Sequence, residues 1–312
     1  MKDLLSVIIP AYNEEMMISR TSFVIHDILD KANIFHELIF VDDGSKDDTW
    51  NRIQYESMNC EYIRGVHFSK NFGKEAAITC GLSYAKGACA VVIDCDLQHP
   101  PEKIVEMYEL WQQGYEIVEA VKTDRGRESA THSFCAKCFY RVISSATQID
   151  MRRASDFKLL DRKAIVALLD MKESNTFFRA LSSWIGFKTI QIEFEVQERI
   201  AGTSKWSTGS LIKYAVSNIT SFSAAPMQIV TVLGGVTFVV SIIMGTISLV
   251  QKILGRALEG FTTVIILQLF FSSIIMLSLG IIGYYIEKIY DEIKGRPKYI
   301  VSRTCGGKQK ES

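Results

Sequence analysis

Two aspartates stand one residue apart at the end of an apolar run, in the segment VVIDCDLQHPPE. In an extended segment side chains alternate, so Asp94 and Asp96 point to one side and Cys95 to the other. Carboxylates held that close raise each other's pKa unless a cation lies between them. Mg²⁺ and Mn²⁺ take oxygen ligands and share them with substrate phosphates. The pair therefore predicts a divalent-metal site for a diphosphate, with Cys95 as a small packed residue.

Polar side chains also follow two earlier apolar runs: Tyr12, Asn13 and Glu14 after the first, and Asp42, Asp43, Gly44 and Ser45 after the second. Ordinary turn chemistry explains one such cluster, since Asp, Gly and Ser end strands in many proteins. Three clusters, with Gln98 beside the aspartate pair, are better explained by one cleft. Ligands of parallel sheets bind beyond the carboxyl ends of the strands.

The elements that must position these clusters alternate along the first two hundred residues. Apolar runs predict strands near residues 4–12, 37–45, 62–70, 89–96 and 115–122, with helical patterns near 14–32, 74–87 and 101–114. Near-continuous apolar strands separated by helices predict an α/β fold, a Rossmann-like, mostly parallel sheet with flanking helices. The alternating segment 188–196 predicts an edge strand or an addition to the sheet.

Other enzymes also place aspartates or polar loops after a strand. Haloacid-dehalogenase phosphatases need Thr or Val two places after the second aspartate, where this chain has Gln98. A dinucleotide oxidoreductase would need G-x-G-x-x-G and a P-loop enzyme G-x-x-x-x-G-K-[ST], and the sequence has neither. The remaining alternative is a pair of surface aspartates that cap the helix beginning at PPEK.

The charge balance and the cysteines indicate which ligands and which redox compartment to expect. Lysine plus arginine (35) equals aspartate plus glutamate (35) in 312 residues, so no excess charge points to nucleic acid. Seven scattered cysteines, an odd number, favour a reducing compartment over a disulfide framework. Cys135 and Cys138 form C-x-x-C on a helical pattern without a second pair, which favours packing over metal or redox chemistry.

Two long stretches, residues 214–251 and 260–286, contain no charged residue. Both exceed the roughly 20 apolar residues that span a bilayer core, and they predict transmembrane helices near 228–250 and 262–286. Buried core helices are the alternative, but these are shorter and interrupted by polar residues. The N-terminal apolar run is too short for a signal peptide and lacks a cleavage site.

The basic residues predict how the chain is oriented. The segment after the second span is rich in Lys and Arg, whereas the loop between the spans has only Lys252 and Arg256. The positive-inside rule places the tail and the N-terminal domain in the cytoplasm, in a multi-pass plasma-membrane protein. We expect a catalytic domain (1–200), a loop with juxtamembrane interfacial helices (201–227), two transmembrane helices (228–286) and a basic cytoplasmic tail (287–312).

Several motifs in a fixed order resemble family 2 glycosyltransferases of the GT-A fold. They are VIIPAYNEE, IFVDDGSKDDT, FSKNFGKEAAITCGL, DCDLQHPPE, SDFKLLDR, QERIAGTSKW and the C-terminal pair of apolar segments. The chain looks most like the polyprenyl-phosphate glycosyltransferases, the bacterial relatives of dolichyl-phosphate mannose synthase. Each motif alone is moderately specific, but their order across nearly the whole chain is very specific.

The resemblance implies a donor site for a UDP-sugar. The residues that would hold the uracil and ribose are Pro10, Ala11, Tyr12, Glu14 and Asp43. Asp94 and Asp96 would bring Mg²⁺ or Mn²⁺ to the UDP diphosphate, and Gln98 would line the sugar pocket. Arg199 and Lys205, on either side of a small-residue turn, would close over the donor phosphates.

Asp156 matches the family's proposed catalytic aspartate at the anomeric carbon, and we count Asp96 as catalytic beside it. A hydroxyl acceptor must lose a proton and needs a base. A phosphate monoester is already largely ionised near neutral pH, with a second pKa of roughly 6. With a polyprenyl phosphate acceptor, Asp156 is expected to orient the acceptor or to steady the sugar. Its alternative role is a helix N-cap, a position that Asp161 fills better.

A lipid phosphate needs cations at the membrane surface, and four residues are candidates: Lys122, Arg125, Lys137 and Arg152. Lys137 belongs to the segment 132–147, whose apolar face suits an interfacial helix. The chain departs from the family here. Relatives usually carry a basic pair near His132 and Ser133 and a hydroxyl near Ala136. For any single cation, a solvated surface position is the alternative.

The expected reaction moves a hexose, glucose from UDP-glucose, onto undecaprenyl phosphate with inversion at the anomeric carbon. A separate flippase would then turn the lipid-linked sugar outward for cell-surface polymers. Transfer of GlcNAc or another hexose stays open, because no pocket residue distinguishes the sugars. A processive polysaccharide synthase would need Q-x-x-R-W and more spans, and an inactive scaffold would have lost an aspartate.

The resemblance also implies self-association. Relatives often form homo-oligomers, and a tetramer is expected. Gly234, Gly235 and Gly245 in the first span would permit close helix approach.

Overall fold

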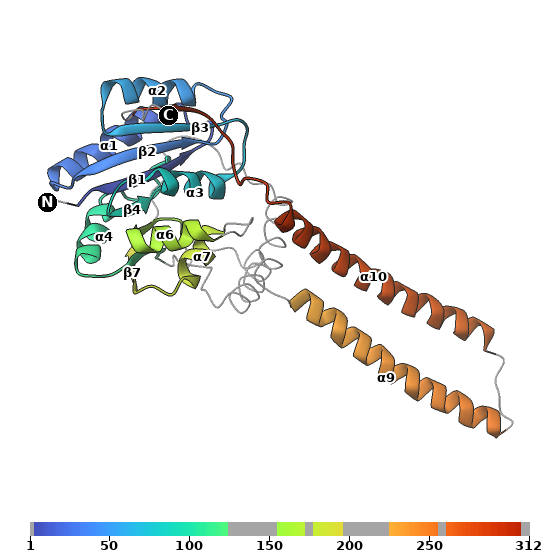
Figure 1. The fold of residues 1–312 in the computed structure, drawn as a ribbon. Coiled ribbons are helices and arrows are strands. Elements are labelled where there is room, and N and C mark those ends of the chain that lie inside the picture. The colour runs from blue at the N-terminus through green and yellow to red at the C-terminus, as the bar shows by residue number, and fades with distance from the viewer. Residues whose placement is uncertain (1–2, 124–154, 172–176, 196–224, 255–259, 307–312) are drawn as a thin grey trace. The chain divides into compact units, whose positions relative to one another are not determined.

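The computed structural model describes residues 3–123, 155–171, 177–195, 225–254 and 260–306. The chain divides into two units, Met1–Ser207 with Pro297–Ser312, and Thr208–Arg296. The first unit carries the sheet and its helices, and the second carries two long helices (Figure 1).

Within the described residues, the first unit contains one eight-stranded sheet in the order β7-β5-β6-β4-β1-β2-β3-β8. β1 pairs in parallel with β2 and β4, β2 with β3, and β5 with β7. β6 is antiparallel to β4 and β5, and β8 is antiparallel to β3. The strands are β1 (Leu5–Ala11), β2 (His36–Asp42), β3 (Ile63–Phe68), β4 (Cys89–Val92), β5 (Ile117–Lys122), β6 (Lys158–Asp161), β7 (Thr189–Phe194) and β8 (Val301–Cys305). The predicted mostly parallel α/β sheet is confirmed, with β7 at an edge.

Helices cover both faces of this sheet, which explains why the central strands are apolar on both sides. One core cluster joins Val7 and Ile9 of β1 to α1 (Ile18–Lys31), α2 (Thr49–Asn59) and α4 (Lys103–Gln112). The intervening Ile8 faces α3 (Lys74–Tyr84), where Gly81 leaves no room for a Cβ atom. α6 (Arg162–Asp170) packs on β4 and β6 and contacts α3 and α7 (Phe178–Trp184). As expected, Asp161 caps α6, since its carboxylate accepts from the Lys163 N–H.

The C-terminal tail contributes a strand that the sequence did not predict. β8 pairs with β3, and the Ser69 N–H donates to the Ile300 carbonyl at 3.0 Å. Just before the strand, Tyr299 stacks on Phe68 with ring centroids 5.1 Å apart. The segment VSRTC carries no apolar run, so its pairing follows from the exposed edge of β3. Residues 301–305 therefore belong to the sheet.

The second unit contains α9 (Ala225–Ile253) and α10 (Phe261–Ile293), which contact each other. Each has a window long and apolar enough to cross a membrane, Val230–Ile247 and Phe270–Ile293, with mean hydropathy 2.2 and 1.6. None of either window is buried, and Phe238 and Met276 are more than two-thirds exposed. Core helices would be buried, so the two predicted apolar helices are confirmed as exposed ones. The predicted interfacial helices, within residues 132–147 and 201–227, lie almost entirely outside the described residues.

Candidate active site

The loops after β1 and β2 are fastened to each other at the carboxyl end of the sheet. The Asn13 N–H donates to Ser45 Oγ (2.8 Å), and Asn13 Oδ1 accepts from the Lys46 N–H (2.9 Å). Asn13 has φ of 54°, a left-handed conformation that asparagine tolerates. The Glu14 N–H donates to Thr49 Oγ1 (2.8 Å), which ties the same loop to α2. The first two polar clusters predicted from sequence are thus hydrogen-bonded to each other.

Asp43 directly follows β2 and is buried, with only 4% of its surface exposed. Its Oδ1 accepts from the Phe72 N–H (2.6 Å) and its Oδ2 from the Gly73 N–H (2.9 Å). Burial raises the pKa of Asp43 to about 6, although both hydrogen bonds act in the opposite direction. The other residues expected on the nucleoside side are close in sequence and space. Pro10 and Ala11 end β1 in register with Val41 and Asp42, and Tyr12 and Glu14 follow, half-buried.

The aspartate pair follows β4, but in a turn rather than in an extended segment. β4 ends at Val92, Leu97 has φ of 55°, and Asp96 Oδ1 accepts from the Gln98 N–H (3.1 Å). The expectation of simple strand alternation was therefore wrong in its geometry. The alternation of exposure survives, since Asp94, Asp96 and Gln98 are partly exposed and the residues between them are buried. Cys95 is 3% exposed, which confirms its packing role.

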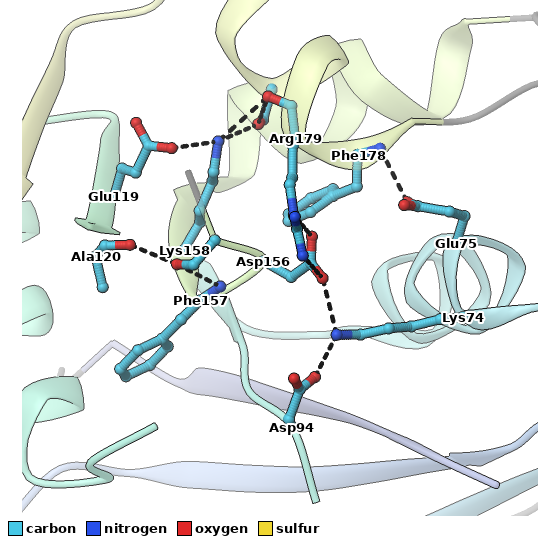
Figure 2. Close-up of polar contacts among 12 residues, drawn as sticks. Lys74, Glu75, Asp94, Glu119, Ala120, Asp156, Phe157, Lys158, Phe178 and Arg179 are labelled. Atoms are coloured by element: carbon cyan, nitrogen blue, oxygen red, sulfur yellow. Dashed lines mark hydrogen bonds and ion pairs between the residues drawn. The ribbon is translucent and has the colours of Figure 1, made fainter. Parts of the chain in front are cut away.

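Lys74, the first residue of α3, lies between Asp94 and Asp156 (Figure 2). Its Nζ is 2.6 Å from Asp94 Oδ1 and 2.8 Å from Asp156 Oδ2. Burial would raise the pKa of Asp94, but the ammonium of Lys74 outweighs it and holds that pKa below its ordinary value. Desolvation would lower the pKa of the part-exposed Lys74, but the same two carboxylates outweigh this effect and raise it. Sequence analysis predicted a cation beside Asp94 and missed that the chain supplies one.

Arg179 of α7 donates two parallel hydrogen bonds to Asp156 from the side opposite Lys74 (Figure 2). Nε donates to Oδ1 at 2.7 Å and an Nη donates to Oδ2 at 2.9 Å. Asp156 is only 3% exposed. Burial would raise its pKa, but Lys74 and then Arg179 outweigh burial and hold the pKa well below the ordinary value. Asp156 is therefore a fixed anion and a poor proton acceptor.

A partly buried side chain, Glu75, and a buried one, Lys158, hold the start of α7, which carries Arg179. Glu75 Oε2 accepts from the Phe178 N–H at 2.9 Å, and burial followed by the nearby Asp156 raises the pKa of Glu75 to about 8. Lys158, 1% exposed, donates to Ser182 Oγ (2.8 Å) and the Arg179 carbonyl (3.3 Å). Its Nζ is also 2.9 Å from Glu119 Oε1 across the β5–β6 pair. These contacts hold Arg179 in position, and Arg179 in turn holds Asp156.

Of the four cations proposed for a lipid phosphate, the structure describes Lys122. It lies exposed at the end of β5. Partial desolvation and then the positive charge of Arg179 lower the pKa of Lys122. The other three, Arg125, Lys137 and Arg152, lie outside the described residues, as do Arg199 and Lys205 of the expected closing loop.

The donor set fits a divalent ion that shares its coordination with a ligand. In the described part of the chain, no three His, Cys, Asp or Glu side chains are grouped so that they could hold a metal ion. Asp94 and Asp96 offer carboxylate oxygens at a partly exposed position. Mg²⁺ is commonly bound by one or two protein carboxylates, and water and phosphate oxygens fill its other coordination positions.

Sequence reasoning missed Lys74, Glu75, Lys158 and Arg179. The signal for the first two was present, because both lie in FSKNFGKEAAITCGL, a motif quoted without a role. Lys158 lies in SDFKLLDR, two residues after Asp156. Arg179 follows a stretch without a motif, and the contacts of α7 with α6, Glu75 and Lys158 bring it to the site.

A mostly parallel sheet with an aspartate pair after β4 and a third, cation-bound aspartate beside it is the arrangement of a GT-A type glycosyltransferase. Residues 6–168 match the family model described as "Glycosyl transferase family 2". The chain belongs to this family of glycosyltransferases.

Relatives match over nearly the whole length. The protein named "Uncharacterized glycosyltransferase YkcC" of Bacillus subtilis (strain 168) is 40% identical over 303 residues, covering 96% of this chain and 94% of that one. The "Prophage bactoprenol glucosyl transferase homolog" of Escherichia coli (strain K12) is 34% identical, covering 96% and 98%. The "Bactoprenol glucosyl transferase" of Shigella phage SfII is 31% identical, covering 97% and 99%.

Solved structures share the fold. A crystal structure of glucosyl-3-phosphoglycerate synthase from Mycobacterium tuberculosis, in complex with Mn²⁺, UDP and phosphoglyceric acid, superposes with a TM-score of 0.51. It is 17% identical and the match covers 70% of this chain and 78% of that one. This likeness shows the GT-A fold.

Proposed function

We propose that the protein transfers a hexose, glucose from UDP-glucose, onto polyprenyl phosphate and so makes a lipid-linked sugar. One observation carries the acceptor class: both oxygens of Asp156 are bound by Arg179 and Lys74. A carboxylate held in this way is a weak base. An alcohol acceptor needs a base, whereas a phosphate monoester attacks as an anion. The relatives named bactoprenol glucosyl transferases support a lipid acceptor and glucose.

In the proposed reaction, an oxygen of the acceptor phosphate forms a bond to the anomeric carbon. The bond from that carbon to the donor diphosphate breaks, its electron pair leaves with UDP, and configuration inverts. Asp43, Pro10, Ala11, Tyr12 and Glu14 hold the uridine, and Gln98 lines the sugar pocket. Asp94 and Asp96 hold Mg²⁺ or Mn²⁺, which when bound would offset charge on the departing diphosphate. Support for Mn²⁺ comes from the structurally similar synthase that was crystallised with it.

On the acceptor side, we assign the lipid phosphate to Lys122 and to three residues outside the described part, Arg125, Lys137 and Arg152. Arg199 and Lys205 would close over the donor phosphates. Lys122 is supported by its place at the end of β5. The same reaction with UDP-GlcNAc or another nucleotide sugar is the alternative, and the acceptor argument is unchanged by it.

We place the protein in the plasma membrane through α9 and α10, with the catalytic domain and the tail in the cytoplasm. The tail strand β8 pairs with β3 of the catalytic domain, so the chain leaves and re-enters one domain around the two helices. Two crossings return a chain to the side from which it started. The positive-inside rule supports the cytoplasm as that side. A homo-oligomer and a separate flippase complete the proposal.

The test uses purified protein in detergent with Mg²⁺ or Mn²⁺, a panel of UDP-sugars, and either undecaprenyl phosphate or undecaprenol. UDP release is followed and the lipid product is weighed by mass spectrometry. We expect transfer from one donor to the phosphate and none to the alcohol. Transfer to undecaprenol would overturn the argument from Asp156. No release with any donor, by protein that binds UDP, would mean that the acceptor is a different nucleophile.

A further inference from the structure

The segment Phe72–Glu75 contacts Asp43, Asp94, Asp156 and the start of α7. Its backbone N–H groups at Phe72 and Gly73 donate to Asp43 on the nucleoside side. The next residue, Lys74, joins Asp94 to Asp156, and Glu75 accepts from the first residue of α7. Four consecutive residues thus connect the nucleoside, metal and transfer regions.

Lys74 differs from a buried structural lysine in its exposure. Its side chain is 40% exposed and that of Asp94 is 29% exposed, whereas Asp156 is at 4%. The outer half of this bridge, from Lys74 to Asp94, is therefore open to a ligand, and the inner half to Asp156 is not. Asp94 is also the first aspartate of the metal-binding pair, so an ammonium and a divalent ion compete for one carboxylate.

We infer that Lys74 is a catalytic residue that exchanges Asp94 for the diphosphate of the donor when the metal-bound nucleotide sugar is loaded. The inference rests on the proposed function for the identity of that anion, a nucleotide diphosphate. Before loading, Lys74 and Arg179 together balance the charges of Asp94 and Asp156 and so keep the acid cluster compact. After loading, Lys74 remains on Asp156 and reaches the diphosphate with its other N–H groups.

The chemistry of this exchange is balanced without proton transfer. A lysine ammonium has three N–H donors, so it can keep Asp156 while a phosphate oxygen replaces Asp94. Negative charge develops on the departing UDP and is stabilised by the ammonium of Lys74. This ammonium is held 2.8 Å from the buried Asp156, and the first turn of α3 sets its position. Preorganised charges of this kind stabilise a transition state without reorganisation cost.

The test compares Lys74→Met with Lys70→Met. Lys70 lies in the loop just before this segment and is exposed, with Nζ 5.0 Å from the centroid of the Phe72 ring. Mn²⁺ binding is measured without nucleotide by the electron paramagnetic resonance of free Mn²⁺. UDP binding with Mn²⁺ is measured by calorimetry, and turnover is measured with the donor and lipid identified above. A melting temperature confirms that each variant is folded.

In Lys74→Met we expect tighter Mn²⁺ binding in the absence of nucleotide, because a competing cation has been removed. We also expect weaker UDP binding and a fall in kcat of about 10²–10³-fold, as for loss of one transition-state donor. Lys70→Met should match the wild type in all three. Lys74→Arg keeps a charge and should leave Mn²⁺ binding near the wild-type value while it recovers part of kcat.

Unchanged or weaker Mn²⁺ binding in Lys74→Met would overturn the inference, as would an unchanged kcat. Should Lys74→Met fail to fold, the folded Lys74→Arg decides, since equal kcat in arginine and lysine forms contradicts a role that depends on ammonium geometry. The two proposals fail separately. A wild-type protein that does not bind UDP overturns the proposed function, whereas equal UDP binding by the wild type and Lys74→Met overturns only the role of Lys74.

Discussion

Arg179 binds Asp156 through two guanidinium nitrogens, at 2.7 and 2.9 Å, and does so in a position where the carboxylate is 3% exposed. Bidentate pairing of this kind is geometrically specific and roughly twice as strong as a neutral hydrogen bond. Asp156 therefore orients two cations around the anomeric carbon in our proposal, Arg179 on the acceptor side and Lys74 toward the donor diphosphate.

The first prediction concerns the acid limb of the pH–rate profile. The pKa of Asp156 lies well below its ordinary value, so Asp156 does not titrate in the working range. The acceptor phosphate, with a second pKa of roughly 6, should set the limb instead, and the rate should rise as pH increases through that value. Asp156→Asn should lower kcat/KM for the lipid at every pH without moving the inflection. An inflection present in the wild type and lost in this variant would identify Asp156 as a base.

The second prediction is that Arg179→Lys is not a conservative change. Lysine offers one point charge in place of two parallel donors, so Asp156 loses its fixed orientation. We expect kcat to fall by about 10²-fold, the scale of a disturbed catalytic geometry. The matched control is Arg52→Lys, at an exposed arginine 3.8 Å from Asp48, which should change nothing measurable. Similar activities of the two variants would contradict the assigned role.

The third prediction concerns the aspartate pair and the metal. Asp96→Ala should abolish sugar transfer and leave the protein folded and in the membrane, because Asp96 is partly exposed and its hydrogen bond from the Gln98 N–H is local. Removal of divalent ions with a chelator should also abolish transfer, and Mn²⁺ or Mg²⁺ should restore it in the wild type only. Asp27→Ala, on the surface of α1, is the control. Retained transfer in Asp96→Ala would refute the assignment of the metal site.

The fourth prediction is a pH dependence of stability from Asp43. Its pKa is raised by burial from 3.8 to about 6 in the folded protein. The folded state then holds the proton more tightly than the unfolded state, so Asp43 contributes stability below about pH 4 and this contribution is lost as pH rises through 6. The shift corresponds to roughly 3 kcal/mol at most.

Asp43→Asn removes this titration. Unfolding free energies of the wild type and Asp43→Asn, measured by denaturant between pH 4 and 7, should therefore differ in slope, with the wild type losing stability relative to the variant as pH increases. Parallel curves would show that Asp43 keeps an ordinary pKa.

The sequence was sufficient where local patterns decide the outcome. Five apolar strand runs, the edge strand near 188–196 and three helices were found from periodicity, because burial of a sheet demands apolar strands. The two long apolar helices were found from their length. Asp161 was found as a cap for the same local reason. The sequence did not reveal β8, whose pairing depends on the edge of β3 more than 200 residues earlier. It also did not reveal the Lys74 bridge, because Asp94 and Asp156 meet only after β6 has paired with β4.

The last prediction tests the attachment of the tail to the catalytic domain. Tyr299 stacks on the fully buried Phe68, and its hydroxyl lies 3.2 Å from Ser83 Oγ on α3. Tyr299→Ala removes the stacked ring and should destabilise the catalytic unit by about 1–3 kcal/mol, less than truncation of a fully buried aromatic. Tyr299→Phe loses one hydroxyl contact and should cost about 1 kcal/mol or less.

Ser302→Ala, exposed on β8, is the neutral control. The melting temperature in detergent should fall in the order Ser302→Ala, Tyr299→Phe, Tyr299→Ala, since each kcal/mol shifts it by about 2–4 °C in a domain of this size. A wild-type melting temperature in Tyr299→Ala would mean that the tail is not packed on the sheet, and the topological argument for two membrane crossings would lose its support.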